Sequence, residues 1–344
     1  MSEIRSILVV RRDNIGDLVC TTPLLSALRR RFPVAWLGAW VNSYNAPVLE
    51  GNPDLDEVCA YTKLKHLDER QSALRTLGAR LAQLWSLRQR RLDCVVLATT
   101  EFRPRELRLA RSLAPHSIAG FRDGGAAASR LDLWVPAAAV AGRHEVERVY
   151  ALASLFGIEG AIPPLRVTPE PAQVEKARAA FGVPSAPRVA VHVSARRPAQ
   201  RWPAERFAAL IERLHAAHGT ATMLLWAPGA ADHPRHPGDD EKAQDIVRRV
   251  GGRAPLMAYP TRRLTELIGA LAACDLVVCP DGGAMHLAAA LGKPIVALFG
   301  DSPPERWHPW GVPYELVVPP TRDLGDLGVD QVAGAFARLA QRRL

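Results

Sequence analysis

The 344-residue chain lacks any long hydrophobic run. No apolar stretch approaches the roughly 20 residues that a membrane-spanning helix needs, so we expect no transmembrane segment. The apolar run at residues 4–10 is too short for a secretory signal, and no small-residue cleavage site follows it, which predicts a cytoplasmic protein. A content of 48% hydrophobic and 23% charged residues is typical of soluble globular proteins, and the length favours two domains.

Cysteine is scarce. The five cysteines are an odd number, none is spaced C-x-x-C, and most lie in apolar runs. We interpret them as reduced core residues and expect neither a disulfide framework nor a cysteine metal site. The turn at residues 11–17, which follows the first apolar run, also lacks the G-x-G-x-x-G pattern of dinucleotide-binding proteins, so we predict no such cofactor.

Acidic residues are fewer than basic ones. The chain has 35 aspartates and glutamates against 44 lysines and arginines, a formal net charge of +9 at pH 7. This excess indicates an anionic partner, and nucleic acid, an acidic membrane surface and a phosphorylated substrate would all qualify. No recognised nucleic-acid-binding module accompanies the charge, so we do not expect nucleic acid as the partner.

The most informative stretch lies near the C-terminus. Its apolar runs at 275–279 and 295–299 predict two buried strands, and the alanine-rich run at 284–291 predicts a helix between them. This order predicts a βαβ unit, and such units bind ligands at the carboxyl ends of their strands. Gly282 and Gly283 would there present backbone N–H groups and the positive end of the helix dipole, which suit a phosphate.

Two side chains beside this turn have alternative interpretations. Asp281 either caps the helix or binds a ribose hydroxyl. His286 falls in the first helical turn, where it either donates to a phosphate or sugar or is a half-buried histidine without a functional role. The residues alone leave both alternatives open.

The same arrangement occurs near the N-terminus. Residues 4–10 predict a buried strand, the R-R-D-N-I-G-D turn follows at 11–17, and residues 18–31 predict a helix. Gly16 would allow a tight turn, and Asp17 lies where the helix begins, either as a cap or as a functional carboxylate. The sequence therefore predicts two polar strand ends of the same kind, one in each half of the chain.

Both stretches resemble one protein family. The string D-G-G-A-M-H-L-A-A-A-L-G-K-P-I-V-A-L-F-G from Asp281, with P-W-G at 309–311, resembles the C-terminal signature of glycosyltransferase family 9, the bacterial lipopolysaccharide heptosyltransferases. The string R-x-D-N-I-G-D-L-V from Arg11 resembles the N-terminal signature of the same family. The two signatures stand in the family's order, so the resemblance spans nearly the whole chain.

This resemblance implies an α/β protein of GT-B architecture, with two Rossmann-like domains that face each other across a cleft. It implies an inverting, metal-independent glycosyltransferase without a cofactor, which moves heptose from ADP-heptose to the inner core of lipopolysaccharide with Asp17 as general base. The chain departs from the family at Gly282, where threonine is commonest, and at Gln200, where lysine is frequent. A family member that uses another nucleotide sugar for a different surface glycan is therefore an alternative, and a sugar-nucleotide epimerase of the same fold is a less favoured one.

Domain bounds follow from the prolines at residues 162–171, which we interpret as a linker. We predict an acceptor-binding domain at 1–163 and a nucleotide-sugar-binding domain at 164–325. We further predict that a helix at 326–344 packs back across both domains.

Site residues are assigned from their place at predicted strand ends and from the family positions. Arginines are expected to bind the donor diphosphate because guanidinium groups match its oxygens in bidentate geometry. The expected donor-binding residues are Ser194, Arg196, Arg197, Arg201, Glu241, Asp281, Gly282, Gly283 and His286. The expected acceptor-binding residues are Asp13, Asn14, Gly16, Glu101, Arg103 and His144.

Two clusters have the composition of metal ligands, and we predict a metal site at neither. The D-L-D at residues 54–56 follows Asn-Pro and leads into a strand, which indicates turn chemistry. The loop with His233, His236, Asp239 and Asp240 is rich in proline, and its acids open a helix, where they stabilise the positive end of the dipole.

A basic helix is the candidate for membrane contact. Residues 67–91 carry leucines at three- and four-residue spacing, Leu81 among them, with arginines at other positions. We expect an amphipathic surface helix with a basic outer face. As a hypothesis, Lys63, Lys65 and these arginines make peripheral contact with the anionic cytoplasmic face of the inner membrane.

Overall fold

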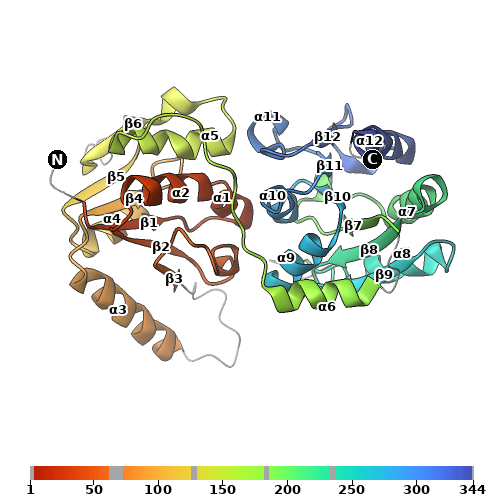
Figure 1. Ribbon diagram of the computed structural model, residues 1–344, viewed down its shortest axis with the longest axis horizontal. Coiled ribbons are helices and arrows are strands. Elements are labelled where there is room, and N and C mark those ends of the chain that lie inside the picture. Colours follow the sequence, from red (N-terminus) through yellow and green to blue (C-terminus); the bar gives the residue numbers. More distant parts are fainter. Residues whose placement is uncertain (1–3, 62–72, 125–129, 182–185, 233–236, 343–344) are drawn as a thin grey trace. The chain divides into compact units, whose positions relative to one another are not determined.

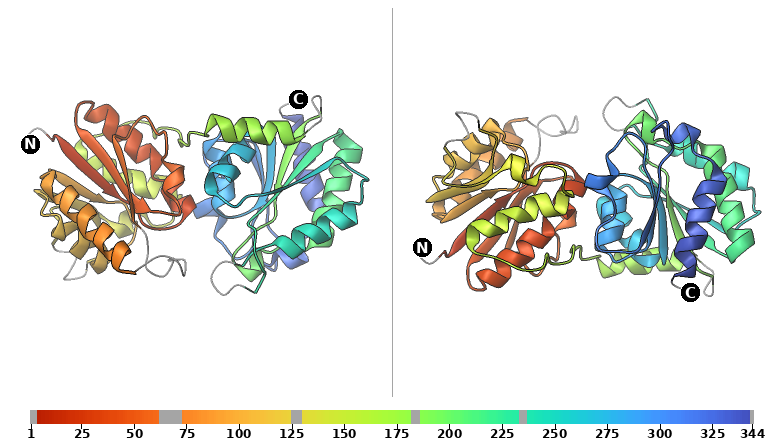
Figure 2. Two further views of the ribbon diagram at one scale, coloured as in Figure 1. Left: turned by 90° about the horizontal axis from the view of Figure 1, so that it is seen from below. Right: turned by 90° about the horizontal axis from the view of Figure 1, so that it is seen from above.

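The computed structural model describes residues 4–61, 73–124, 130–181, 186–232 and 237–342. The chain divides into two compact units, Met1–Val167 and Thr168–Leu344. This division falls within the proline-containing stretch at 162–171, and the domain bounds given above stay a prediction. In each unit helices cover a parallel sheet (Figure 1 and Figure 2).

The first unit contains six parallel strands in the order β3-β2-β1-β4-β5-β6. The strands are β1 (Ser6–Val10), β2 (Trp36–Asn42), β3 (Glu57–Tyr61), β4 (Cys94–Leu97), β5 (Ser117–Arg122) and β6 (Leu133–Pro136). The helices are α1 (Ile15–Val19), α2 (Thr22–Arg31), α3 (Ala73–Gln89), α4 (Pro104–Ser112) and α5 (Glu145–Tyr150), with short 3-10 turns at Ala46–Val48, Ala137–Val140 and Ala151–Phe156. This is the strand order of the Rossmann fold, which reverses between its first and fourth strands. Ligands of such folds bind at the carboxyl ends of the two strands on either side of the reversal, here β1 and β4.

Helices lie on both faces of this sheet. On one face, α3 and α4 bring Leu84, Leu87 and Leu107 into a core with Leu8 of β1 and Val95 of β4. On the other face lie α2 and α5, which contact each other (Figure 2). All five residues of β1 are buried, as expected for a central parallel strand that is covered on both sides.

The helix predicted after the first strand is in fact two helices. α1 ends at Val19 and α2 begins at Thr22. Pro23 lacks the N–H that a continuous helix would require, but in the first turn of α2 that N–H would have no helical partner. The Thr21 hydroxyl donates to the Asp17 carbonyl (2.8 Å) and so bridges the break.

The second unit contains six parallel strands in the order β12-β11-β10-β7-β8-β9. The strands are β7 (Arg188–His192), β8 (Ala221–Trp226), β9 (Leu256–Pro260), β10 (Leu276–Pro280), β11 (Ile295–Leu298) and β12 (Tyr314–Val317). The helices are α6 (Pro171–Phe181), α7 (Ala204–His218), α8 (Asp240–Val250), α9 (Leu264–Ala273), α10 (Gly283–Ala290), α11 (Pro304–Trp307) and α12 (Val329–Gln341), with 3-10 turns at Pro198–Gln200 and Leu324–Asp326. Counted within the unit, this is again the Rossmann order, and the reversal lies between β7 and β10. The predicted α/β class is confirmed, with one Rossmann-like sheet in each unit.

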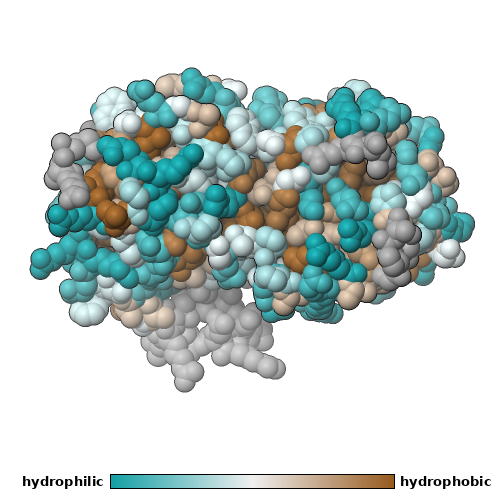
Figure 3. All heavy atoms as spheres, viewed as in Figure 1, coloured by the Kyte–Doolittle hydropathy of each residue, from teal (hydrophilic) through white to brown (hydrophobic). Residues whose placement is uncertain are grey.

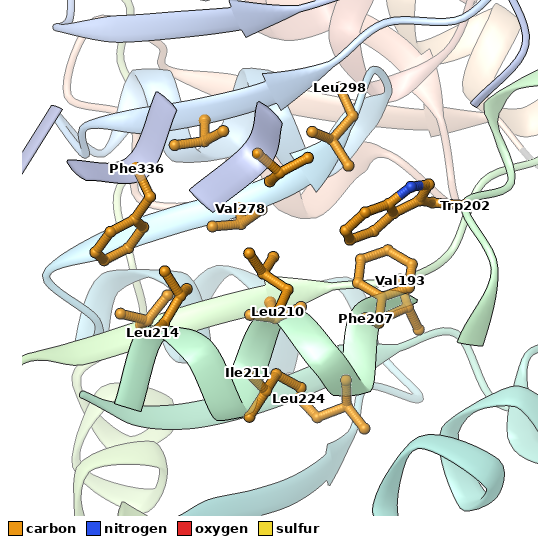
Figure 4. Packing of buried hydrophobic residues seen from close by; sticks show 14 of the residues in the cluster. Val193, Trp202, Phe207, Leu210, Ile211, Leu214, Leu224, Val278, Leu298 and Phe336 are labelled. Atoms are coloured by element: carbon orange, nitrogen blue, oxygen red, sulfur yellow. The ribbon is translucent and has the colours of Figure 1, made fainter. Parts of the chain in front are cut away.

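The large core of the second unit lies between its sheet and helices α7, α8 and α12 (Figure 4). Trp202 and Phe207 are fully buried there and pack edge to face, with ring centroids 4.7 Å apart. The Trp202 indole N–H donates to the Leu327 carbonyl (2.8 Å), so the buried ring keeps a hydrogen-bond partner. Phe336 brings α12 into the same core. The further contact of this helix with both domains stays a prediction.

The predicted core position of the cysteines is confirmed. All five are buried, and none forms a disulfide. In the part of the chain that the structure describes, no helix combines the length and apolar character needed to cross a membrane. Hydrophilic side chains predominate on the face seen in Figure 3, and apolar ones form small separate areas there.

The opposite face of the second sheet is covered by α6, α9 and α10, and one glycine sets the spacing of two of these helices. A Cβ added at Gly269 of α9 would lie 2.5 Å from the Cβ of Gln173 in α6 and 2.7 Å from its carbonyl carbon. Any side chain at position 269 would therefore push the backbone of α6 away.

We predict that Gly269→Ala lowers the free energy of unfolding by about 1–3 kcal/mol, because the added methyl group separates α6 from α9. Gly334→Ala is the matched control, since Gly334 also lies inside a helix and its nearest neighbour to a new Cβ is Arg338 Nη1 at 3.7 Å. The control should raise the free energy of unfolding by about 1 kcal/mol through helix propensity. Urea unfolding of both variants measures the difference, and a Gly269→Ala protein as stable as the wild type would contradict the close packing.

Candidate functional site

Polar residues follow the strands on either side of the reversal point in each sheet. In the first unit they follow β1 and β4, and in the second they follow β7 and β10. The carboxyl ends of parallel strands meet at one edge of a sheet, where ligands bind in this class of fold. Each unit therefore holds one candidate binding edge.

Arg11 follows β1 and is the centre of the candidate site in the first unit. Its side chain is 2% exposed, and its Nη2 donates to Asp17 Oδ1 (2.7 Å) and Glu145 Oε1 (2.9 Å). Its Nη1 donates to the Ala98 carbonyl after β4, and its Nε lies 3.2 Å from Asp13 Oδ2. Burial disfavours the charged form, but the three carboxylates raise the pKa of Arg11 above its ordinary value. One permanently charged guanidinium thus joins segments that are far apart in the sequence.

Asp17, the predicted catalytic residue, lies in α1 with its side chain 15% exposed. Its Oδ1 accepts from Arg11, and its Oδ2 accepts from the backbone N–H and the side-chain amide of Asn14, both at 3.1 Å. Burial raises the pKa of Asp17, but the Arg11 charge and these hydrogen bonds outweigh that effect, so the pKa lies below its ordinary value. Asp17 is therefore an ionised carboxylate of fixed orientation. Its bond to the Asn14 N–H is also the helix-capping contact that the sequence left open.

Two of the predicted acceptor-binding residues, Asp13 and Arg103, lie together. The Asp13 carboxylate accepts from Arg103 Nη1. The Asp13 carbonyl accepts from Asn42 Nδ2 (3.0 Å), the Tyr44 hydroxyl (3.0 Å) and Asn45 Nδ2 (3.2 Å). These contacts fix the loop between β1 and α1, on which the orientation of the site depends.

The other predicted acceptor-binding residues have different surroundings. Asn14 and Glu101 are exposed. His144 is 2% exposed and caps α5, where its Nδ1 accepts from the backbone N–H of Val146 (3.1 Å). Gly16 lies within α1, so the tight turn that we assigned to it is instead made by the residues before the helix.

In the second unit, Gln200 links the ends of two strands. It is 6% exposed, and its Nε2 donates to Asp281 Oδ2 (3.1 Å) and to the Ser302 hydroxyl. Asp281 follows β10, and Ser302 lies beyond the end of β11. The interpretation of Asp281 as a helix cap is wrong, because the cap position of α10 is Gly282 and no side chain bonds there. The Asp281 carboxylate is oriented by Gln200 instead.

The three predicted donor-site arginines have different partners. Arg201 donates to the carboxylate of Asp239, whose side chain is fully buried. Arg197 is exposed and lies 3.5 Å from Asp301, which is also exposed. Arg196 is exposed as well. The charge of Arg201 is therefore already balanced within the protein, whereas Arg196 and Arg197 are accessible to a ligand.

The start of α10 matches the sequence analysis. Gly283 is the first residue of this helix, directly beyond Gly282 and the end of β10. Its first N–H groups have no partner within the helix, as at any helix N-terminus. His286 lies in the first turn but is only 3% exposed, with its ring 5.8 Å from the Trp307 ring in edge-to-face contact.

Two further predicted donor residues lie at the ends of β7 and β8. The Ser194 hydroxyl accepts from the backbone N–H of Ala227 (2.9 Å), and Glu241 is exposed at the start of α8. Among the residues that the structure describes, no three histidine, cysteine, aspartate or glutamate side chains form a group that could hold a metal ion. His233 and His236 lie outside the described residues.

The sequence analysis missed two titratable groups beside this edge, the partly buried Lys242 and the buried His192. Lys242 donates to the Val193 carbonyl (3.1 Å) and lies 5.0 Å from the ring centroid of Phe207. Burial lowers the pKa of Lys242 to about 8. His192 ends β7, and burial, followed by the charge of Lys242, lowers the pKa of His192 to about 4. Tertiary packing covers both side chains, Lys242 only in part, and it leaves no signal in the local sequence.

We predict that Arg11→Met lowers the free energy of unfolding by about 3–5 kcal/mol, because the fully buried Glu145 carboxylate loses its partner at 2.9 Å and keeps only Arg148 at 3.9 Å. Arg103→Met is the control: its side chain is 44% exposed, and its ion pair with Asp13 should be worth less than about 1 kcal/mol. Chemical unfolding gives the free energy of unfolding of both variants. Arg11→Lys is measured as a third variant, which keeps the positive charge. Equal losses for the Met variants would contradict the central role of Arg11.

Comparison with known proteins gives one consistent family. Residues 80–325 match the sequence profile of glycosyltransferase family 9 (heptosyltransferase). Lipopolysaccharide heptosyltransferase 2 of Salmonella typhimurium is 27% identical, over 88% of this chain and 85% of its own length. Lipopolysaccharide heptosyltransferase 3 of Escherichia coli is 22% identical, over 86% of this chain and 83% of its own.

Solved structures agree in fold. A family 9 glycosyltransferase from Veillonella parvula matches with a TM-score of 0.82 at 19% identity and covers 99% of both chains. ADP-heptose lps heptosyltransferase II of E. coli matches with a TM-score of 0.76 at 22% identity, covering 98% of this chain and 99% of its own. These likenesses confirm the predicted GT-B fold class. Since the matched profile covers well over half of the residues, the chain belongs to glycosyltransferase family 9 (heptosyltransferase), and the protein is a glycosyltransferase.

Proposed function

We propose that the protein transfers heptose from ADP-heptose to the inner core of lipopolysaccharide, with inversion at the anomeric carbon. The observation that carries this proposal is the Asp17 carboxylate, held ionised by Arg11 and Asn14 at the carboxyl edge of the first sheet. Support for the sugar comes from relatives named lipopolysaccharide heptosyltransferase. Support for the nucleotide comes from the fold likeness to an E. coli heptosyltransferase solved with ADP and with ADP-2-deoxy-2-fluoro heptose.

In the proposed reaction, Asp17 accepts the proton of the attacking hydroxyl of the acceptor. The freed oxygen forms a bond to the anomeric carbon of the donor as the bond from that carbon to the diphosphate oxygen breaks. Attack from the side opposite to the leaving group inverts the configuration. ADP leaves with the bonding electron pair, so its release requires positive charge and hydrogen-bond donors near the diphosphate.

The second unit offers such groups without a metal ion. The N-terminus of α10 at Gly282 and Gly283 presents N–H groups and the positive end of a helix dipole. Arg196 and Arg197 are exposed cations after β7, and we assign the diphosphate to them. We do not assign Arg201 to direct contact with the diphosphate, because its guanidinium is paired with Asp239. Arg201 would act only by holding the loop that carries Arg196 and Arg197. We assign a donor hydroxyl to Asp281, whose carboxylate is oriented by Gln200.

A second candidate is a family 9 transferase that uses another nucleotide sugar for a different surface glycan. The observation in its favour is Gln200, a neutral side chain that binds Asp281 where the family often has a lysine. The site then carries less positive charge than the family pattern implies. The epimerase alternative has fold likeness alone, to a UDP-N-acetylglucosamine 2-epimerase with a TM-score of 0.51 at 12% identity.

We assign acceptor binding to the first unit, through Asp13, Asn14, Glu101 and Arg103, whereas the buried His144 would act only by holding the start of α5. Work on a lipopolysaccharide precursor would place the protein at the cytoplasmic face of the inner membrane, in peripheral contact with its anionic lipids. Lys63 and Lys65, which the sequence analysis assigned to that contact, lie outside the described residues. This location is part of the proposal.

We predict that Asp17→Asn lowers kcat by about 10²–10⁴-fold, because the amide cannot accept the proton. It should leave the affinity for ADP unchanged. Because the pKa of Asp17 lies below its ordinary value of 3.8, wild-type activity should show no loss from protonation of this residue until the pH falls below that value. Asp56→Asn, in the same unit but before β3, is the control. Turnover near the wild-type rate in folded Asp17→Asn would contradict the assignment.

We predict that ADP binds about tenfold or more tightly than UDP or GDP, with a chelator present. Calorimetric titration gives the three affinities. Arg197→Gln should weaken ADP binding by about tenfold, since a hydrogen bond between charged groups is lost. Preference for UDP or GDP would keep the proposed base and favour the second candidate. Product formed from donor without acceptor would instead favour an epimerase.

A further inference from the structure

Helix α3 of the first unit exposes two large apolar side chains. Leu81 is 59% exposed and Trp85 is 66% exposed. They are four residues apart, so they lie next to each other on one face of the helix. The sequence analysis placed Leu81 on the face that packs inward, and that assignment is wrong.

Other residues hold the inward face of α3. Leu87 is 1% exposed, and with the partly buried Leu84 it packs in the core of the first unit. Gln83 Oε1 accepts from the Trp40 indole (3.1 Å), and Gln83 Nε2 donates to the Ala60 carbonyl (3.1 Å). The helix therefore cannot rotate to bury Leu81 and Trp85 without breaking these contacts.

The segment that carries the exposed pair has charges of one sign. Residues 73–91 include no aspartate or glutamate and five arginines. Arg88 is exposed and lies one turn from Trp85. Its guanidinium donates to the Ser112 carbonyl, which is neutral, so the positive charge of Arg88 is held in place without being neutralised. Arg90 is paired with Glu57, so the argument rests on Arg88.

We infer that this α3 face, made by Leu81, Trp85 and Arg88, binds the surface of an anionic lipid bilayer. Tryptophan and leucine enter the boundary between head groups and acyl chains, while arginine pairs with lipid phosphate. Residues 73–91 supply arginine and no carboxylate, which favours anionic lipid over a basic partner. The inference rests on the peripheral membrane contact that is part of the proposed function, and it assigns that contact to one face. Such contact needs no membrane-spanning helix and does not depend on which sugar the enzyme transfers.

A protein partner or a second copy of this chain would also cover an apolar face. The lone Leu81 and Trp85 pair is small compared with a stable protein interface, which buries about 800 Å² on each side. Residues 73–91 carry arginines and no carboxylates, so two copies of this face would repel each other. Both considerations favour the bilayer.

The test is co-sedimentation of the full chain with vesicles of phosphatidylethanolamine and phosphatidylglycerol at low salt. Trp85→Ala and Leu81→Ser should each lower the partition coefficient, Trp85→Ala by about tenfold or more. Arg88→Gln should lower it by about fivefold, and this loss should vanish in roughly 0.5 M salt. The matched control is Trp134→Ala, because Trp134 is 42% exposed in the same unit but lies on β6, below Arg122. The control should partition as the wild type does.

Three outcomes would overturn the inference. The first is the absence of binding to anionic vesicles, and the second is equal binding by the wild type and Trp85→Ala. The third is a concentration-dependent dimer in analytical ultracentrifugation that Trp85→Ala abolishes, which would assign the face to a second copy. ADP affinity and thermal unfolding of each variant show that the protein is folded. Failure to bind vesicles would also remove the membrane location from the proposed function, whereas the transfer reaction itself is decided by the Asp17→Asn and ADP measurements.

Discussion

The buried guanidinium of Arg11 is the interaction on which the first candidate site depends. It meets carboxylates from the β1–α1 loop, from α1 and from α5, together with a carbonyl beyond β4. A cation in this position is stable only because the carboxylates surround it, and Glu145 is equally dependent on the cation. The orientation of Asp17 is therefore set by a network that spans the unit and not by its own helix alone.

Both units place their polar residues by the same strand order. In each sheet the order reverses between two central strands, and the loops beyond those strands carry the polar residues. The first unit fills this place with several carboxylates around the buried Arg11, and Arg103 pairs with Asp13 nearer the surface. The second places a helix N-terminus, exposed arginines and the Gln200–Asp281 pair there. A base for a sugar hydroxyl requires an ionised carboxylate, whereas a leaving diphosphate requires hydrogen-bond donors and positive charge. The two units supply one of these each, which supports the proposed division of roles.

The sequence was sufficient where local pattern determines structure. Buried apolar runs predicted the central strands, and the turn before Gly283 predicted the helix start beyond β10. It was insufficient where distant segments meet. Glu145 becomes part of the site only because the start of α5 lies beside Arg11, and Gln200 reaches Asp281 only because β7 neighbours β10. The break before Pro23 and the outward turn of Leu81 were missed for a related reason. Leucine spacing shows that a helix has an apolar stripe but not which part of the stripe the rest of the protein covers.

The buried thiols provide a way to measure local unfolding within each of the two units. Cys94 lies in the first unit and Cys274 in the second, and burial raises their pKa values to about 11 and about 12. Both are thus protonated and shielded in the folded protein, and alkylating reagents react with thiolates. Modification of each cysteine therefore waits for local or global opening of its own unit. Peptide mapping after timed alkylation can therefore report the stability of the two units separately within one intact chain, because the native cysteines serve as the reporters.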